Sequence, residues 1–254
     1  KETIDQLLRN QQELTESIEA TKAKYKETID QLLRNQQELI ESNKVIKAKL
    51  EHYISIIDFT AEFEGNKFDG IISKLTKIYG GNVHEQRIVT ITSNGGNPVY
   101  KDNPSMYEVK NVVDFDNKYS YFQSKDENGS WIQFNFHIYK VKPSKYSIRS
   151  RYDLPPDTQY SIHNSPMEWV IEASNTGNSN DWIVLDERNF NKKQSNPFNQ
   201  PGIEHTFDIQ KQLGEDEYYQ YFRMRITGVT YTIFGGNHYC LTISAFEFFG
   251  SIKS

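Results

Sequence analysis

The chain lacks several features that would settle its class at once. It has one cysteine in 254 residues, so no intrachain disulfide can form. No apolar run approaches the roughly 18 residues that a membrane-spanning helix needs. The net charge at pH 7 is −5, without the basic excess that nucleic acid or an anionic membrane attracts. We therefore expect no nucleic-acid and no membrane partner, and a reducing, cytoplasmic compartment.

Motifs that carry catalysis are also missing. No two of the six histidines lie close enough in sequence for a local zinc motif, and there is neither a G-x-S-x-G nor a phosphate-loop pattern. Cys240 lies in the strand-like stretch HYCLTIS, which predicts a buried structural thiol and not a nucleophile. We expect a protein that is not an enzyme and uses no cofactor.

What the chain does have is a repeat. Residues 1–14, KETIDQLLRNQQEL, return unchanged as residues 26–39. The 25-residue period equals three heptads plus four residues, a stutter that locally relaxes a left-handed supercoil. No Pro or Gly occurs before Gly65, and good helix formers dominate. We predict one helix over residues 1–62, lengthened by a tandem duplication.

An apolar heptad row predicts that this helix is a coiled coil. The row that starts four residues later is interrupted by Lys22, Gln36 and Asn43, which either pack weakly or specify register; both alternatives stay open. A lone helix would leave the apolar row in water, so we expect a partner helix, from a second copy of the chain or from another helical protein. The main row comprises Ile4, Gln11, Ile18, Tyr25, Leu32, Leu39, Ile46 and Tyr53.

The heptad pattern decays between Asp58 and Gly65, and the dipeptide Gly65-Asn66 is a stop signal. A short amphipathic helix is predicted next, in FDGIISKLTKIYGGN, where Gly80-Gly81 supplies the terminator. Its apolar face would consist of Ile71, Ile72, Leu75, Ile78 and Tyr79.

The remaining residues favour short strands with period two. WIQFNFHIYKV, EWVIEAS, WIVLDER, HTFDI, YFRMRITG and LTISAFEFFG are separated by clusters of Pro, Gly, Asn and Asp. Many short strands without long helices predict an antiparallel sandwich or barrel. Trp131, Trp169 and Trp182 should lie partly buried at strand starts. The interior should contain Phe134, Ile171, Val184, Phe222, Met224 and Phe248.

Five stretches in order, SKDENGSWIQFNF, KPSKYSIRSRY, EWVIEASNTGNSNDWIVLDERN, YYQYFRMRITG and ISAFEFFG, resemble the coagulation factor 5/8 type C, or discoidin, domain. The likeness covers residues 66–252 and is greatest to the intracellular type found beside BTB and ankyrin modules. It implies a mainly β fold, a galactose-binding-like jelly-roll β-sandwich, here preceded by the coiled-coil α-helix.

The resemblance also implies where a ligand would bind. In this family, ligands meet loops at the end of the sandwich away from the chain termini, which here correspond to residues 95–111, 152–166 and 229–239. The implied hydrogen-bonding residues are Arg149 or Arg151, Asn237 and His238, and the implied stacking faces are Tyr152 or Tyr231. The alternative is that both arginines only line the solvent face of a strand.

Related carbohydrate-binding domains often hold a structural calcium ion. The stretch VDFDNKYSYF resembles their acidic loop, with Asp114, Asp116 and Ser120 as oxygen donors. The glutamate expected in the last strand is absent, because Ala245 occupies that position. Turn residues are therefore the preferred interpretation of this loop, and no metal is expected.

These patterns predict a non-enzymatic scaffold. It would oligomerise through the coiled coil and bind a protein partner through the discoidin-like domain, within a cytoskeletal or flagellar assembly. The alternative is a multivalent, lectin-like protein that binds glycans. On sequence alone the protein partner ranks first, because an intracellular domain joined to a rod meets proteins more often than free glycans.

Overall fold

The chain forms two compact units, Lys1–Ile56 and Ile57–Ser254. The computed structural model describes residues 2–55, 58–95, 107–152, 165–190, 195–230 and 238–254. The boundary lies before the predicted start of the β domain at residue 66, because residues 59–61 already belong to a sheet of the second unit.

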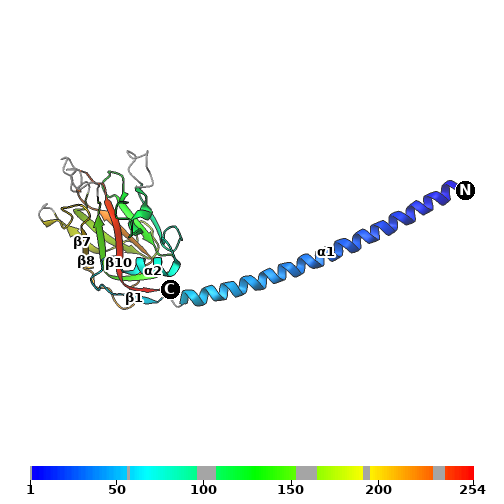
Figure 1. Ribbon diagram of the computed structural model, residues 1–254, viewed down its shortest axis with the longest axis horizontal. Helices are drawn as coiled ribbons and strands as arrows, with labels where there is room; N and C mark the ends of the chain where they lie inside the picture. The colour runs from blue at the N-terminus through cyan, green and yellow to red at the C-terminus, as the bar shows by residue number, and fades with distance from the viewer. Residues whose placement is uncertain (1, 56–57, 96–106, 153–164, 191–194, 231–237) are drawn as a thin grey trace. The chain divides into compact units, whose positions relative to one another are not determined.

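The first unit is one helix, α1 (Glu2–Ser55) (Figure 1). It ends ahead of the predicted position 62, since the next residues pair with the last strand of the chain. Every side chain between residues 3 and 49 is exposed. The Ile, Leu and Val residues among them are 42–64% exposed, so the described part of the helix leaves its own apolar side chains uncovered. The long helix is confirmed, and its pairing in a coiled coil stays a prediction.

The second unit is a sandwich of two antiparallel sheets, as predicted. The first sheet has the order β1-β10-β5-β8, and β3 also pairs with β10. Its long strand β10 pairs with β5 along one edge, and with β3 and β1 along the other. β1 lies beside the C-terminal end of β10 (Figure 1). The strands are β1 (Phe59–Ala61), β3 (Phe122–Gln123), β5 (Lys140–Ser150), β8 (Glu204–Asp208) and β10 (Thr242–Lys253).

The second sheet has the order β2-β4-β9-β6-β7. Its strands are β2 (Thr90–Ser93), β4 (Trp131–Asn135), β6 (Glu168–Ser174), β7 (Ile183–Asn189) and β9 (Tyr221–Ile226). The predicted single run WIQFNFHIYKV is two strands, because the chain turns between β4 and β5. His137 adopts a positive φ of 55° there, and its amide donates to Asn135 Oδ1 at 2.8 Å.

The inner faces of the two sheets form one core. Phe134, Ile171, Phe222, Met224 and Phe248 are all at most 1% exposed, which confirms those five predictions. A buried hydrogen-bond chain also crosses between the sheets: Trp169 Nε1 donates to Tyr146 Oη, which donates to Asp186 Oδ2.

Three predictions about the core are wrong. Val184 is 47% exposed, because a register shift between Ile171 and Glu172 breaks the alternation in β7 and turns the next two residues, Leu185 and Asp186, inward. Trp169 is fully buried, since it packs among three phenylalanine rings and donates a hydrogen bond. Ile78 is 52% exposed, on the outer side of the short helix.

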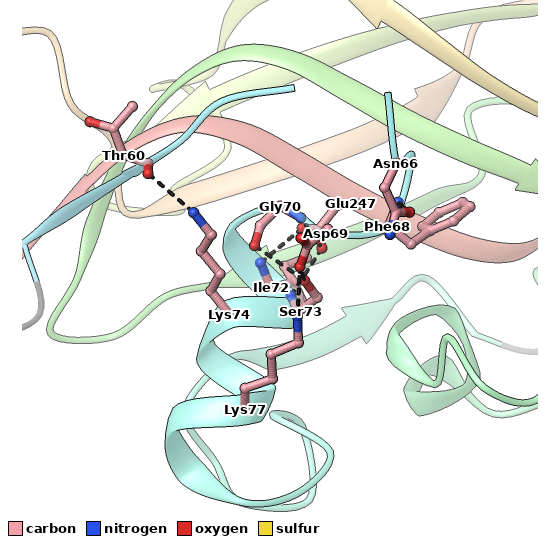
Figure 2. Close-up of polar contacts among 10 residues, drawn as sticks. All are labelled: Thr60, Asn66, Phe68, Asp69, Gly70, Ile72, Ser73, Lys74, Lys77 and Glu247. Carbon is pink, nitrogen blue, oxygen red and sulfur yellow. Dashed lines mark hydrogen bonds and ion pairs between the residues drawn. The ribbon is translucent and has the colours of Figure 1, made fainter. Parts of the chain in front are cut away.

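That helix, α2 (Ile71–Tyr79), begins on a buried carboxylate. Gly80 ends it with a φ of 72°, as predicted, and the five-residue 3-10 helix η3 (Val109–Val113) follows later in the chain. Glu247 of β10 is fully buried and points at the first turn of α2 (Figure 2). Its oxygens accept from the amides of Gly70 at 3.2 Å, Ile72 at 2.8 Å and Ser73 at 2.9 Å.

Gly70 permits this close approach. A Cβ atom at Gly70 would lie 2.2 Å from the Phe248 carbonyl oxygen and 2.7 Å from the Glu247 side chain. Burial raises the pKa of Glu247 to about 7, although hydrogen bonds from the amides of Ser73, Ile72, Phe248 and Gly70 act in the opposite direction. The carboxyl group therefore gains a proton more readily in the folded state.

We expect the stability of the sandwich to fall as the pH rises through this window. The contribution of Glu247 is fully present below its unfolded pKa of about 4.5 and is lost as the pH rises through about 7. Urea unfolding of the wild type and of Glu247→Gln at several pH values measures this slope. It should be absent from E247Q; an identical slope in the two proteins would contradict the prediction.

A matched control is Glu172→Gln. Burial acts to raise the pKa of Glu172, but hydrogen bonds from Arg225 and Arg223 outweigh it and keep the pKa below its usual value. The contribution of Glu172 is therefore present above its unfolded pKa and is lost as the pH falls, so E172Q should change the slope with the opposite sign.

The core predicts a second contrast. Phe134→Ala should lower the free energy of unfolding by about 3–5 kcal/mol, because it opens a cavity among fully buried rings. Val184→Ala removes an exposed side chain, so it should change stability by no more than about 0.5 kcal/mol. Denaturant unfolding of both variants checks the assignment of inner and outer faces. Equal costs would show that the two faces are misassigned.

Candidate functional site at the loop end

The loop end is the end of the sandwich where β5 finishes and β10 begins. Ser150 pairs with Ile243 there, and Ile243 also pairs with Phe122. The opposite end holds Lys140 and Lys253, and β1 pairs with β10 near it. Three of the predicted ligand residues, Arg151, Tyr152 and His238, follow or precede these strands at the loop end.

The first cluster at the loop end is a pair of tyrosines with a cation. The rings of Tyr119 and Tyr152 meet edge to face, with centroids 5.3 Å apart. Lys118 Nζ lies 5.1 Å from the Tyr119 centroid and 5.0 Å from the Tyr152 centroid. Tyr119 is 39% exposed. The cluster therefore presents an aromatic surface beside a positive charge.

Gly202 holds Tyr152 in place. Its φ is +67°, and its amide donates to the Arg151 carbonyl at 2.9 Å. A Cβ atom at this position would lie 2.4 Å from Tyr152 Cδ2, so a larger residue would displace the ring. The turn at Gly202, just before β8, therefore fixes the position of one ring of the aromatic pair.

A second cluster contains Arg151, the residue before Tyr152 in the chain. The Arg151 guanidinium stacks over the Tyr121 ring, 4.1 Å from its centroid, and Tyr121 meets Tyr107 edge to face at 5.0 Å. Asn111 Nδ2 donates to the Tyr121 carbonyl at 3.0 Å, which ties this segment to η3. Arg151 is half-buried and Tyr121 is 3% exposed, so the stack forms the floor beside the tyrosine pair.

Arg149 has a different role. Its side chain is 11% exposed, its Nε donates to Glu204 Oε1 at 2.8 Å, and its Nη1 donates to the Phe115 carbonyl at 3.3 Å. The guanidinium also lies 4.5 Å from the Phe68 ring centroid. These contacts join β5, β8 and the segment after η3, so Arg149 braces the sandwich, and its role in ligand binding stays a prediction.

His238 forms a pair that the sequence did not reveal. Its Nδ1 lies 2.5 Å from Asp126 Oδ2, and Asp126 Oδ1 accepts from the Tyr239 amide at 2.6 Å. Both side chains are about two-fifths exposed, at 39% and 40%. The aspartate comes from the turn between β3 and β4, 112 residues earlier. Tyr231 and Asn237, the other predicted ligand residues, lie outside the described residues.

The acidic loop forms no cation site that the structure shows. Asp114 ends η3, and its amide donates to the Asn111 carbonyl at 3.2 Å. Ser120 Oγ donates to the Asn117 carbonyl at 3.1 Å, and Asp116 is exposed. Within the described residues, no three His, Cys, Asp or Glu side chains gather as a metal site would require. Ala245 is buried in β10 and contributes no oxygen ligand from its side chain.

Two further features bear on chemistry. Cys240 is buried, and burial raises the pKa of its thiol to about 11, so it is protonated and inaccessible near neutral pH. In the part of the chain that the structure describes, no helix has both the length and the apolar character to cross a membrane.

Four residues of the loop end were missed on sequence. Lys118, Tyr119 and Tyr121 come from the stretch NKYSYF, whose sequence resembles part of a calcium-binding loop, and Asp126 comes from the following turn. The available signal was the tyrosine spacing in this stretch. Tyrosine beside lysine in a polar loop is typical of exposed recognition surfaces.

Comparison with known proteins gives limited similarity. No protein-family profile matches the chain, and no curated protein matches it. Among solved structures, the chain is similar to a fucolectin from striped bass (Morone saxatilis) serum, with 15% identity and a TM-score of 0.43. The match covers 64% of this chain and 47% of the fucolectin, so it spans about half the length of that protein.

Two bacterial domains are similar at the same level. One is the family 32 carbohydrate-binding module of Clostridium perfringens NanJ, solved in complex with galactose, with 10% identity and a TM-score of 0.41 over 66% of this chain and 96% of the module. The other is the C-terminal domain of a Bacteroides fragilis chitobiase, with 14% identity and a TM-score of 0.46 over the same shares. Membership of the discoidin family stays a prediction.

Proposed function

We propose that the second unit is a non-enzymatic module that binds a glycan at the loop end. The observation that carries this proposal is the pair of exposed Tyr119 and half-buried Tyr152, with Lys118 over both rings. Sugar sites combine an aromatic face, which packs against the C–H face of the ring, with planar polar groups that bind hydroxyls. The Asp126–His238 pair supplies such polar groups at the same end of the sandwich.

The character of the surface favours a glycan over a protein partner. Protein interfaces have an apolar, aromatic-rich centre that is fully buried on binding. On the described part of the sandwich, the large exposed hydrophobic side chains are Ile78, Tyr119, Ile138 and Val184, each on a different element. Of these four described residues, Tyr119 lies at the loop end. Isolated exposed apolar residues do not form a docking patch, so the order of the two alternatives is the reverse of that predicted from sequence.

The tyrosines should carry the affinity. We expect Tyr119→Ala and Tyr152→Ala each to weaken glycan binding about tenfold or more, which corresponds to the loss of roughly 1.4 kcal/mol of ring contact. A glycan array probed with the full chain identifies the sugar, and titration of the variants measures the change in Kd. The array should include immobilised galactosides and fucosides.

The control for this experiment is Tyr218→Ala. Tyr218 is half-buried at the opposite end of the sandwich, with Lys142 and Lys253 over its ring. Its substitution should leave glycan binding unchanged. If all three variants bind a glycan as the wild type does, the site lies elsewhere; if the full chain binds no glycan but captures a protein through Tyr119 and Tyr152, the scaffold alternative is correct.

A second candidate role, oligomerisation, is supported by α1. An isolated helix with a row of exposed Ile and Leu side chains gains free energy when that row is buried against another helix. We propose that α1 gathers copies of the chain, so that weak loop-end sites act together. The proposed setting is the cytoplasm, supported by the single buried thiol.

Light scattering on the full chain tests this role. The wild type should contain more than one chain, and Leu7→Glu with Leu32→Glu should be a single chain because both leucines are exposed apolar side chains of α1. Glutamate is a good helix former, so the helix itself persists, as circular dichroism can check. Arg9→Ala with Arg34→Ala, on the opposite face, should leave the mass unchanged. A wild type that is a single chain at all concentrations contradicts the proposal.

A further inference from the structure

The repeated segment gives α1 two equivalent binding faces. Residues 1–25 and 26–50 are identical at 19 of 25 positions, of which 14 are consecutive. We call residues 1–14 the first repeat and residues 26–39 the second repeat. A period of 25 residues is close to seven turns of a straight α-helix, about 25.2 residues. Equivalent side chains therefore point in the same direction, roughly 37 Å apart along the axis.

The structure shows this equivalence in the side chains. Ile4 and Ile29 are 63% and 55% exposed, and Leu14 and Leu39 are both 62% exposed. The polar contacts recur as well. Gln6 donates to Asn10 at 3.1 Å in the first repeat, and Gln31 donates to Asn35 at 2.8 Å in the second. Arg9 donates to Gln6 at 3.2 Å, and Arg34 donates to Gln31 at 2.9 Å. Each repeat thus presents the same surface.

The apolar side chains of each repeat form one band. With about 100° of rotation per residue, the four Ile and Leu positions of the two repeats fall within about 140° of the helix surface. The members of this apolar band are Ile4, Leu7, Leu8, Leu14, Ile29, Leu32, Leu33 and Leu39, each more than half exposed.

Most charged residues of a repeat lie away from this band. Between Ile4 and Ile18 the charged residues are Asp5, Arg9, Glu13 and Glu16, and the same helical rotation puts all four on the opposite side. In coiled coils, charges beside the seam select the partner and fix the register. The exception is Lys26, which begins the second repeat and lies at one edge of the band by the same rotation. The first repeat also begins with lysine, so no charge distinguishes the first repeat from the second.

We propose that parallel chains pair through α1 in two registers, aligned or shifted by one 25-residue repeat. This inference rests on the proposed self-association and concerns its geometry. In a parallel pair shifted by 25 residues, the second repeat of one chain faces the first repeat of the next, and each residue of a repeat meets the same neighbours as in the aligned pair. The occupant of the exposed band is therefore a second copy of this chain.

The shifted register has a consequence that the aligned register lacks. A shifted pair leaves one repeat of each chain open, and that repeat accepts a further chain. The contact is head-to-tail and does not close, so it extends into a linear array. Within the array each chain uses both of its repeats, as in an aligned pair, and successive chains leave the rod roughly every 37 Å.

Disulfide trapping on the full chain tests the shift. Gln11 and Gln36 are equivalent positions near the middle of the band, and both are exposed. A disulfide requires Cα atoms within about 7 Å, so it reports register. We mix Gln11→Cys carrying a size tag with untagged Gln36→Cys, oxidise the mixture, and separate the products without reduction. Cys240 is buried and should not react.

The expected result is a mixed disulfide between Cys at positions 11 and 36, in an amount comparable to the product of the Gln11→Cys variant with itself. The control partner is Asn43→Cys, which is also exposed. It lies seven residues beyond Gln36, about 10 Å along the axis, and should give no more than a tenth of that mixed product.

The remaining outcomes separate this inference from the proposed function. Self-linking of Gln11→Cys with a mixed product at the control level overturns the shift and leaves aligned self-association standing. Association by light scattering without any of these disulfides overturns the parallel arrangement, and the inference with it. A single chain by light scattering and no disulfide overturns both the shift and the self-association.

Discussion

The hydrogen bonds between Glu247 and the first turn of α2 connect the last strand of the sandwich, β10, to the helix near the start of the second unit. A helix N-terminus leaves four amides without partners in the helix, and the N-cap residue here, Gly70, has no side chain to satisfy them. A carboxylate 175 residues away in sequence supplies the acceptors instead. Because β10 also pairs with β1, β3 and β5, the strand that holds α2 is the strand that holds most of its sheet.

This arrangement explains where sequence patterns predict the fold well and where they fail. Alternation predicts the buried side of β4 and β9 correctly, since each has one face on the core. It places Glu247 on the solvent side of β10, because Phe246 and Phe248 flank it. The structure covers that side with α2 and η3, so nearly all of β10 is buried. Nothing local in FEFF distinguishes a carboxylate under a helix from one in water.

The prediction that Val184 is interior fails for a different reason, an irregularity in strand pairing. Val184 is exposed, contrary to the prediction, and Asp186 is buried, because a bulge shifts the register of β6 against β7. Sequence periodicity assumes an unbroken ladder, and one added residue reverses every later assignment. Asp186 is then buried but satisfied, by Tyr146 and by the Arg188 guanidinium. The predicted architecture of the sheets survives, while the assignment of single residues does not.

The candidate site shows the same limit. Arg151, Tyr152 and His238 can be placed at one end of the sandwich from the sequence, because each adjoins a strand end. Their partners Tyr121, Tyr119 and Asp126 are 30 or more residues distant in sequence, and only the packing of the η3 and β3 segments on β5 and β10 brings them together. Arg149 and Arg151 are separated by tertiary context, since Arg149 pairs with Glu204 on β8 and Arg151 stacks on the Tyr121 ring.

The affinity expected of a single loop-end site links the proposed roles of the two units. A site made of two tyrosines, a lysine and one polar pair immobilises few groups of a ligand, so we expect a single site to bind weakly. Gathering several sites raises the local concentration of binding groups without any new contact, provided that the ligand spans the distance between them. Under the proposed assembly that distance is a multiple of the repeat length in α1. If both proposals hold, the chemistry of the loop end decides which sugar is bound, and the 25-residue period decides which spacing of sugars is bound tightly.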